Sequence, residues 1–197
     1  RSAGPWLVCR FILFKLMFMS GVVKLTSLPQ SKHPRLDLPS TKSPAIFPAM
    51  NVPGFRIGDV EVAPATVLAP MEGITDRPFR RMIRTLGGCG LTVTEFISSE
   101  QVTRNSRRAW RMAEFDPDEH PVSIQIYGRD PQKMADAAVA CQDLGADIID
   151  LNLGCPSKQV TSGCSGSALM KEPQLAQQIF ERVVPQLSIP MTVKMRL

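Results

Sequence analysis

The sequence predicts an α/β fold, in which a parallel β-sheet is covered by helices, and three observations lead to this prediction. From Met50 onward, short apolar runs of strand length alternate with longer segments of helical periodicity. Asp, Pro and Gly residues stand at the boundaries between the two kinds of segment, where helices begin and end. The strand-length runs are strongly apolar, which is typical of parallel strands buried on both faces.

The first predicted elements are a hairpin, a strand and a helix. Residues 55–62 are expected to form a hairpin with its turn at Gly58-Asp59, and residues 65–69 a first apolar strand. Asp76 is the expected N-cap of the following helix, and Gly87-Gly88 should end it. The predicted apolar face of this helix consists of Phe79, Met82, Ile83 and Leu86.

Four further strands alternate with three further helices. The predicted strands cover residues 91–94, 122–127, 147–151 and 191–195. The predicted helices cover a segment from about Ser98, a segment from Asp130-Pro131 to Gly145, and residues 173–184. Ser98 and Gln101 have the spacing of a capping box.

Five such strands between residues 65 and 195 fit the first part of an eight-stranded barrel, which typically needs about 250 residues. The predicted fold class is therefore an α/β (β/α)8 TIM barrel, truncated after about strand five. Its N-terminal part would occupy residues 50–197. A doubly wound open sheet is the alternative, because periodicity does not distinguish closed from open sheets.

Residues 1–49 differ in composition and are predicted to form an unstructured tail. An apolar run from Trp6 to Val23, interrupted by Arg10 and Lys15, leads into a proline-rich stretch. Translated upstream sequence, an organelle-targeting leader and a membrane anchor remain open as interpretations. The two charges in the apolar run argue against a membrane span, so no stable membrane association is expected.

The net charge of +5 comes from the tail and is no sign of RNA binding by the folded part. Residues 1–60 hold eight Lys or Arg against two Asp, whereas the rest holds fifteen basic and sixteen acidic residues.

The cysteines and histidines limit the possible chemistry. The five cysteines are odd in number and scattered, which suits a reducing compartment, and we expect a cytoplasmic protein. With two histidines in the chain, neither a histidine-based triad nor a multi-histidine metal centre is expected, and no metal is predicted.

Polar residues stand at or just after the end of every predicted strand. In (β/α) barrels the active site is built at the C-terminal ends of the strands. Any one of these residues could be a solvated or capping residue, but polar residues at five consecutive strand ends indicate a site. They are Glu72, Glu95, Gln125, Asn152, and the pair Lys194 and Arg196.

Two segments at these strand ends resemble signatures of the tRNA-dihydrouridine synthase family. Residues 69–80, APMEGITDRPFR, resemble its opening signature. Residues 152–158, NLGCPSK, with residues 163–170, GCSGSALM, are similar to the segment that carries the family's active cysteine.

Two further blocks, residues 123–128 and 192–196, match in the family's order, so that the resemblance covers about residues 54–197. Cys164 stands where another small residue is expected. The resemblance implies an oxidoreductase that reduces the C5=C6 bond of uridines in tRNA, with FMN as cofactor and NADPH as reductant.

By matching position, the resemblance implies roles for individual residues. Pro70, Met71 and Glu72 would contact FMN through their backbone, Gln125 would hydrogen-bond the ring edge, and Lys194 would lie beside the ring. An ammonium on a rigid strand is suited to stabilising the negative charge of a reduced flavin.

Cys155 would be the catalytic residue, protonating C5 while hydride reaches C6. An unactivated thiol holds its proton at neutral pH and can act as a general acid. By the same resemblance, Asn152, Lys158 and Arg196 would face the substrate.

Spacing alone singles out two more features. Arg104, Arg107, Arg108 and Arg111 are predicted to form one helical stripe, either as phosphate contacts or as a solvated face. Gly163 and Gly166 are interpreted as a tight loop beside the site.

Two other functions remain open. One is another FMN barrel oxidoreductase, such as a dihydroorotate or dihydropyrimidine dehydrogenase, although the 69–80 block argues against it. The other is an inactive tRNA-binding fragment, because three strands of the predicted barrel are missing.

Overall fold

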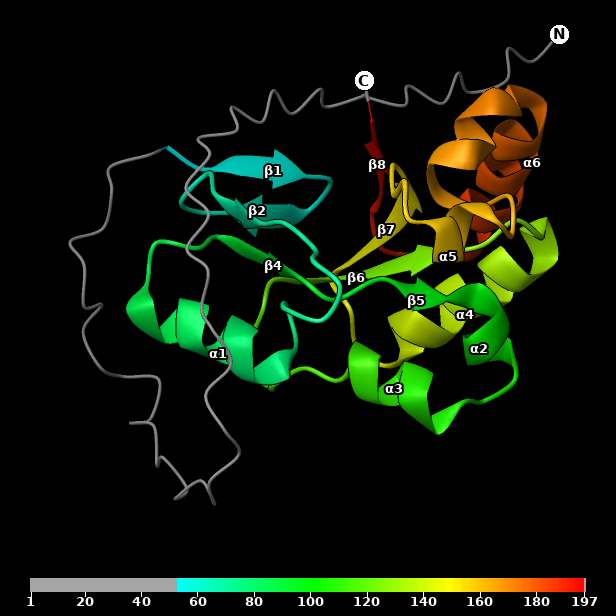
Figure 1. The fold of residues 1–197 in the computed structure, drawn as a ribbon. Helices are drawn as coiled ribbons and strands as arrows, with labels where there is room; N and C mark the ends of the chain where they lie inside the picture. Colours follow the sequence, from blue (N-terminus) through cyan, green and yellow to red (C-terminus); the bar gives the residue numbers. More distant parts are fainter. Residues whose placement is uncertain (1–52, 197) are drawn as a thin grey trace, which may run out of the picture. The chain divides into compact units, whose positions relative to one another are not determined.

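The structure is a computed structural model that describes residues 53–196, in which a parallel sheet is combined with helices (Figure 1). The predicted tail, residues 1–49, lies outside the described residues. Among residues 53–196, none of the helices combines the length and apolar composition that crossing a membrane requires.

The predicted hairpin is confirmed. Strand β1 (Phe55–Ile57) pairs antiparallel with β2 (Val60–Val62), and Phe55 lies opposite Val62. The turn places Gly58 at φ 57°, a left-handed conformation that glycine adopts without steric strain.

The main sheet consists of parallel strands in sequential order. Its path is β3 (Val67–Leu68), β4 (Leu91–Val93), β6 (Val122–Tyr127), β7 (Ile148–Leu153) and β8 (Met191–Met195), and β5 (Ile97–Ser98) pairs with β6 off this path. A doubly wound sheet requires a reversal of strand order. No reversal occurs between β3 and β8, so the described part of the chain does not support that alternative.

The helices and helical turns lie between the strands. They are α1 (Arg77–Leu86), α2 (Ser99–Thr103), α3 (Arg107–Ala113), α4 (Pro131–Asp143), α5 (Lys158–Thr161), η1 (Gly166–Lys171), α6 (Pro173–Val183) and η2 (Val184–Gln186). The predicted N-cap Asp76 is confirmed, because it accepts a hydrogen bond from the Phe79 N–H. The helix predicted to start at Asp130-Pro131 is confirmed as α4, and Asp130 caps it by accepting from the Lys133 N–H.

The single helix predicted from Ser98 is two helices. The helical conformation is interrupted between α2 and α3 at Asn105, which has φ 55°. Trp110 Nε1 donates to Asn105 Oδ1 at 2.6 Å, a hydrogen bond that connects α3 to the interruption at Asn105. Ser98 is the N-cap of α2 but makes no side-chain capping hydrogen bond, so the predicted capping box is wrong.

The predicted apolar face of α1 is also partly wrong. Met82 is 43% exposed, whereas Arg80 is fully buried. Arg80 pairs with the carboxylate of Glu119, which is equally buried. The ion pair satisfies the guanidinium inside the protein, which periodicity of apolar residues does not reveal.

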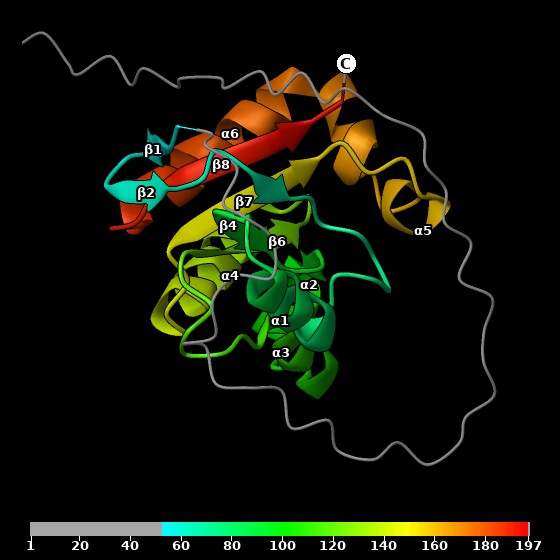
Figure 2. The ribbon, with the colours of Figure 1, turned by 90° about the vertical axis from the view of Figure 1, so that its left-hand side faces the viewer.

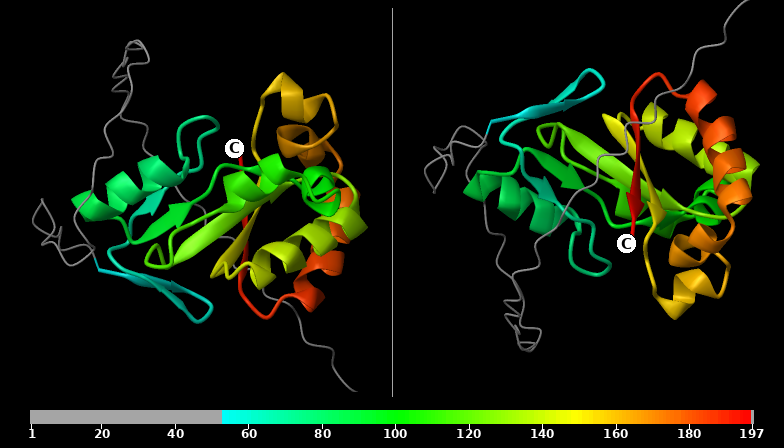
Figure 3. Two further views of the ribbon diagram at one scale, coloured as in Figure 1. Left: turned by 90° about the horizontal axis from the view of Figure 1, so that it is seen from below. Right: turned by 90° about the horizontal axis from the view of Figure 1, so that it is seen from above.

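The core lies between one face of the sheet and helices α4 and α6. These two helices pack against each other on the same side of the strands (Figure 2, Figure 3). The alanine-rich face of α4 allows close approach to β6 and β7, which contribute Ile124, Ile126, Ile149 and Leu151. Because side chains alternate along a strand, the intervening residues of β6 and β7 point to the opposite face.

Candidate functional site

The face of the sheet opposite the core carries a row of polar side chains near the C-terminal ends of β6, β7 and β8. The strand register places Gln125 beside Asp150, Asp150 beside Thr192, and Asn152 beside Lys194. Gln125, Asp150 and Asn152 are all buried. The structure therefore brings together three residues predicted from the sequence, Gln125, Asn152 and Lys194.

Hydrogen bonds join Asp150, Gln125 and Asn152 into a chain that we call the amide relay. Asp150 Oδ2 accepts from Gln125 Nε2 at 2.5 Å, and Gln125 Oε1 accepts from Asn152 Nδ2 at 2.8 Å. Asp150 Oδ1 accepts from the Thr192 hydroxyl at 2.6 Å. The relay ends at Asn152 Oδ1, which accepts from the backbone N–H groups of Gly154 and Cys155.

Electrostatics on this face depends on Asp150 and Lys194. Burial raises the pKa of the Asp150 carboxyl, while the hydrogen bonds from Thr192 and Gln125 and the charge of Lys194 act in the opposite direction. Within residues 53–196, the Lys194 side chain makes no hydrogen bond or ion pair. Its ammonium is therefore available to an anionic group on the polar face.

The loop that carries Cys155 is held from three sides. Besides Asn152, Arg196 Nε donates to the carbonyl of Gly154 at 3.1 Å, and Ser167 N donates to the carbonyl of Cys155 at 2.9 Å. Gly166 has φ 60°, and a Cβ there would lie 2.7 Å from the Cys155 carbonyl oxygen. Gly166 therefore forms the predicted tight loop beside Cys155, with its backbone packed against that residue.

The loop after β3 is fixed by side chains that use two of its backbone N–H groups. Met71 N donates to Thr75 Oγ1 at 3.0 Å, and Gly73 N donates to the Glu95 carboxylate. Pro70 has no N–H, and the Glu72 N–H has no hydrogen-bond partner among residues 53–196. Of the three residues predicted to contact a cofactor through the backbone, Glu72 is the one that offers a donor.

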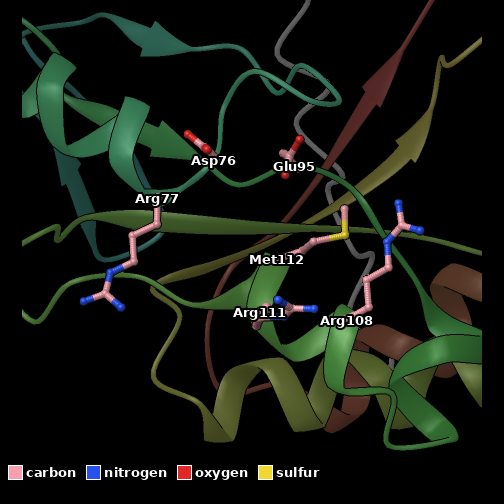
Figure 4. A pocket seen from close by; sticks show the side chains of 6 residues that line it. All are labelled: Asp76, Arg77, Glu95, Arg108, Arg111 and Met112. Carbon is pink, nitrogen blue, oxygen red and sulfur yellow. The ribbon is translucent and has the colours of Figure 1, made fainter. Parts of the chain in front are cut away.

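A hollow of about 190 Å³ lies between this region and helix α3 (Figure 4). It is lined by Asp76, Arg77, Glu95, Arg108, Arg111 and Met112. Figure 4 shows the Arg77 guanidinium lying apart from those of Arg108 and Arg111. Arg77 is bound to Asp116, whereas the side chains of Arg108 and Arg111 make no ion pair within the described residues.

The four-arginine stripe is a prediction that the structure corrects. Arg104 follows α2, on the other side of the interruption at Asn105, and pairs with Glu100 at 2.7 Å. Arg108 and Arg111 remain together on α3, where both line the hollow.

One predicted site residue lies outside the hydrogen-bonded face, and two residues of that face were not predicted. Lys158 is exposed in α5, and its side chain makes no hydrogen bond or ion pair within the described part of the chain. Asp150 and Thr192 were not identified from the sequence. The signal was present, because polar residues recur at every second position as Asp150 and Asn152, and as Thr192 and Lys194.

Within the described range, no group of three or more His, Cys, Asp or Glu side chains is placed to hold a metal ion.

Comparison with known proteins gives a consistent result. Residues 67–197 match the family model described as Dihydrouridine synthase (Dus). The chain is 46% identical over 141 residues to a tRNA-dihydrouridine synthase B of Pseudomonas syringae pv. tomato, covering 72% of this chain and 42% of that protein. It is 43% identical over 143 residues to a probable tRNA-dihydrouridine synthase of Rickettsia bellii, covering 72% and 44%.

A probable tRNA-dihydrouridine synthase of Rhodobacter capsulatus is 45% identical over 143 residues, again covering 72% of this chain and 44% of the relative. The chain spans less than half the length of these curated relatives. The matched segment contains β3 to β8, the amide relay and the Cys155 loop, and the chain belongs to the dihydrouridine synthase family.

Proposed function

We propose that the protein carrying this chain is a tRNA-dihydrouridine synthase, which reduces the C5=C6 bond of uridines in tRNA with FMN and NADPH. The observation that carries the proposal is the position of the Cys155 loop beside the polar face that contains Gln125 and Lys194. Names of related proteins that act on tRNA support the substrate.

The proposed architecture is the N-terminal part of an FMN-binding (β/α)8 barrel over residues 50–197, preceded by a tail of residues 1–49 that is not part of the fold. Sequential parallel strands with helices between them support the barrel. In such barrels the site lies at the C-terminal ends of the strands, which is where the polar face and the Cys155 loop are found.

The residues present fit a flavin. Among residues 53–196, Lys194 offers an ammonium with no hydrogen-bond partner, Glu72 offers a backbone N–H, and Gln125 Nε2 retains one N–H after binding Asp150. These donors suit the oxygen and nitrogen edge of an isoalloxazine ring, and Lys194 would balance its negative charge. Bound FMN, recharged by NADPH, would supply the hydride.

Cys155 would deliver a proton to C5 of the uridine while C6 receives hydride. Its backbone N–H and carbonyl are both hydrogen-bonded, which fixes the position of the backbone from which its half-buried side chain extends. Carbanion character at C5 must be quenched by an acid within about 3 Å, and a positioned general acid typically contributes 10² to 10⁴ in rate.

Substrate contacts are proposed for Asn152, Lys158 and Arg196. Asn152 uses Oδ1 and one N–H within the protein, so that a single N–H remains for a substrate. Arg196 uses Nε on the Gly154 carbonyl, which leaves the rest of its guanidinium available for tRNA. The exposed Lys158 has its ammonium available as well.

The test is Cys155→Ala in the complete protein. We expect unchanged flavin content and unchanged flavin reduction by NADPH, with hydride transfer to tRNA slowed by about 10² to 10⁴. Cys155→Ser should not restore the rate, because a hydroxyl is a weaker acid than a thiol. Cys164→Ala, which removes an exposed thiol in the neighbouring loop, is the matched control and should transfer at the wild-type rate.

A wild-type rate in Cys155→Ala would contradict the proposed role of the thiol. Dihydrouridine content of tRNA, measured against reduction of free pyrimidines and oxidation of dihydroorotate, separates the proposed function from other FMN barrel oxidoreductases. A purified protein without flavin absorbance would contradict the enzyme proposal itself.

A further inference from the structure

We propose that Asp150 is a positioning residue for the Cys155 loop, acting through Gln125 and Asn152. The inference deepens the proposed function, on which its catalytic meaning rests. Its structural content, that Asp150 fixes the loop, stands on hydrogen bonds within the protein alone.

The hydrogen-bond partners at the two ends of the relay agree with each other: both select the same one of the two possible orientations for each amide. At one end, the N–H groups of Gly154 and Cys155 need an acceptor, so that the oxygen of Asn152 faces them and its Nδ2 faces Gln125. This turns the oxygen of Gln125 toward Asn152 and its Nε2 toward Asp150. At the other end, the carboxylate of Asp150 is the acceptor that this arrangement requires.

Asp150 is the one member of the relay whose side chain is not an amide. An amide can be turned by half a rotation, which exchanges its donor and its acceptor, whereas an ionised carboxylate only accepts. Without an acceptor at position 150, Gln125 Nε2 would be a buried donor without a partner, and rotation of Gln125 would place two donors face to face at Asn152. Such a defect costs about 1–3 kcal/mol per group, enough to favour a displaced loop.

The acceptor, rather than the charge, is what the relay requires. In Asp150→Asn, the amide oxygen can still accept from Gln125, while its Nδ2 donates to the Thr192 hydroxyl, which is able to rotate and accept. Asp150→Ala removes the acceptor. Thr192→Val removes the other hydrogen bond of Asp150 and leaves the relay intact, so it is a matched control of nearly the same shape.

The readout is alkylation of Cys155 by iodoacetamide, resolved by peptide mass spectrometry in the complete protein. The exposed Cys164 serves as the internal reference in every variant. Cys155 is half-buried and packed against Gly166, so release of its loop should expose it. We expect the ratio of Cys155 to Cys164 alkylation to rise at least about fivefold in Asp150→Ala and to stay within about twofold of wild type in Asp150→Asn and Thr192→Val.

A second readout connects the relay to the reaction. Because misplacement of a reacting group by about 1 Å can lower a rate about 10²-fold, kcat for tRNA reduction should fall about 10- to 100-fold in Asp150→Ala. Asp150→Asn should recover most of this loss, which a general loss of stability would not explain. If Asp150→Ala fails to give a cooperative unfolding transition, Asp150→Ser carries the same prediction, because its short hydroxyl does not reach Gln125.

An unchanged alkylation ratio in the folded Asp150→Ala or Asp150→Ser variant would overturn the proposal. Equal changes in Asp150→Asn or Thr192→Val would overturn it as well, because neither removes the acceptor. If wild-type protein fails to reduce tRNA while the alkylation pattern is as expected, the proposed function falls and the positioning of the loop by Asp150 stands.

Discussion

Two buried polar networks at opposite ends of the sheet differ in how their cations are bound: Arg80 is paired with a carboxylate, whereas Lys194 makes no ion pair among residues 53–196. At the start of β6, Arg80 makes four hydrogen bonds, to the Glu119 carboxylate and to the carbonyls of Thr75 and Glu114. Glu119 also accepts from Thr92 and from the Asp116 N–H. At the other end, the amide relay adjoins groups that have no partner in the described part of the chain, namely the Lys194 ammonium and one N–H of Gln125.

The difference indicates separate tasks for the two ends. Arg80 is a buried charge that is bound by groups of the protein. It connects α1 to the segment before β6 and leaves few hydrogen-bonding groups for a ligand. A network with unpartnered donors presents those donors to whatever binds. In barrels of this kind, the N-terminal ends of the strands generally serve stability and the C-terminal ends serve function.

The largest effect is expected at the first network, for Arg80→Met. Removing one partner of a buried ion pair leaves Glu119 as an uncompensated charge and should lower the free energy of unfolding by about 3–5 kcal/mol. Denaturant unfolding followed by circular dichroism measures this. The neighbouring Arg81 is exposed, so Arg81→Ala should change stability by less than about 0.5 kcal/mol. Equal stability of the two variants would show that the network does not hold α1.

The same comparison predicts a different result for Lys194→Ala. Because the Lys194 side chain makes no hydrogen bond or ion pair among residues 53–196, its loss removes only the effect of its charge on the buried Asp150. It should lower the free energy of unfolding of the flavin-free protein far less than Arg80→Met does. A hydrogen bond to a charged group contributes about 1.5–3 kcal/mol, so FMN should bind about 10- to 100-fold more weakly. Fluorescence titration of flavin measures the affinity, with exposed Lys171→Ala as control. Unaltered FMN affinity would remove Lys194 from the proposed cofactor site.

A smaller effect is expected for Arg108→Gln with Arg111→Gln. If both guanidiniums contact tRNA phosphates, affinity should fall for all tRNAs alike, and the slope of log K against log salt should shrink by about two. Arg104→Gln is the control, because Arg104 already pairs with Glu100. A slope that does not change would identify the two arginines as a solvated face.

The sequence predicted well what depends on local signals. β6 and β8 have the predicted bounds, and Asp76 and Asp130 cap their helices, because apolar runs and capping residues act within a few positions. It predicted poorly what depends on distant partners. Arg80 is buried because Glu119, far along the chain, pairs with it. The end of α2 was missed for a local reason, because the left-handed φ of Asn105 is not marked by the periodicity of apolar residues.

For the site, residue types at strand ends identified Gln125, Asn152 and Lys194, whereas Asp150 was missed although it belongs to the same face. Its alternation with Asn152 marked it as a residue of that face, but its role depends on its partners Gln125 and Thr192, which come from two other strands. Strand register decides which side chains of separate strands meet, and local pattern alone does not give it.

The smallest predicted effect concerns Cys164, in the loop that packs beside Cys155. It has φ 52°, a left-handed conformation that costs a residue with a Cβ about 1–2 kcal/mol. Glycine avoids this cost but loses about 0.5–1 kcal/mol through its freer unfolded chain. Cys164→Gly should therefore raise the free energy of unfolding by up to about 1 kcal/mol, measured by denaturant unfolding.

Two controls separate backbone conformation from side-chain contacts in that measurement. Cys164→Ala keeps the Cβ and should leave stability within about 0.5 kcal/mol of wild type, because the exposed thiol makes no hydrogen bond among the described residues. Asn105→Gly relieves a similar φ but loses the hydrogen bond from Trp110, so its gain should vanish or reverse. A stabilisation of Cys164→Ala equal to that of Cys164→Gly would show that the thiol, rather than the backbone, is unfavourable there. Because Cys164 makes no hydrogen bond to the amide relay among residues 53–196, tRNA reduction should be unchanged in Cys164→Gly, which would then be more stable without any change in the site.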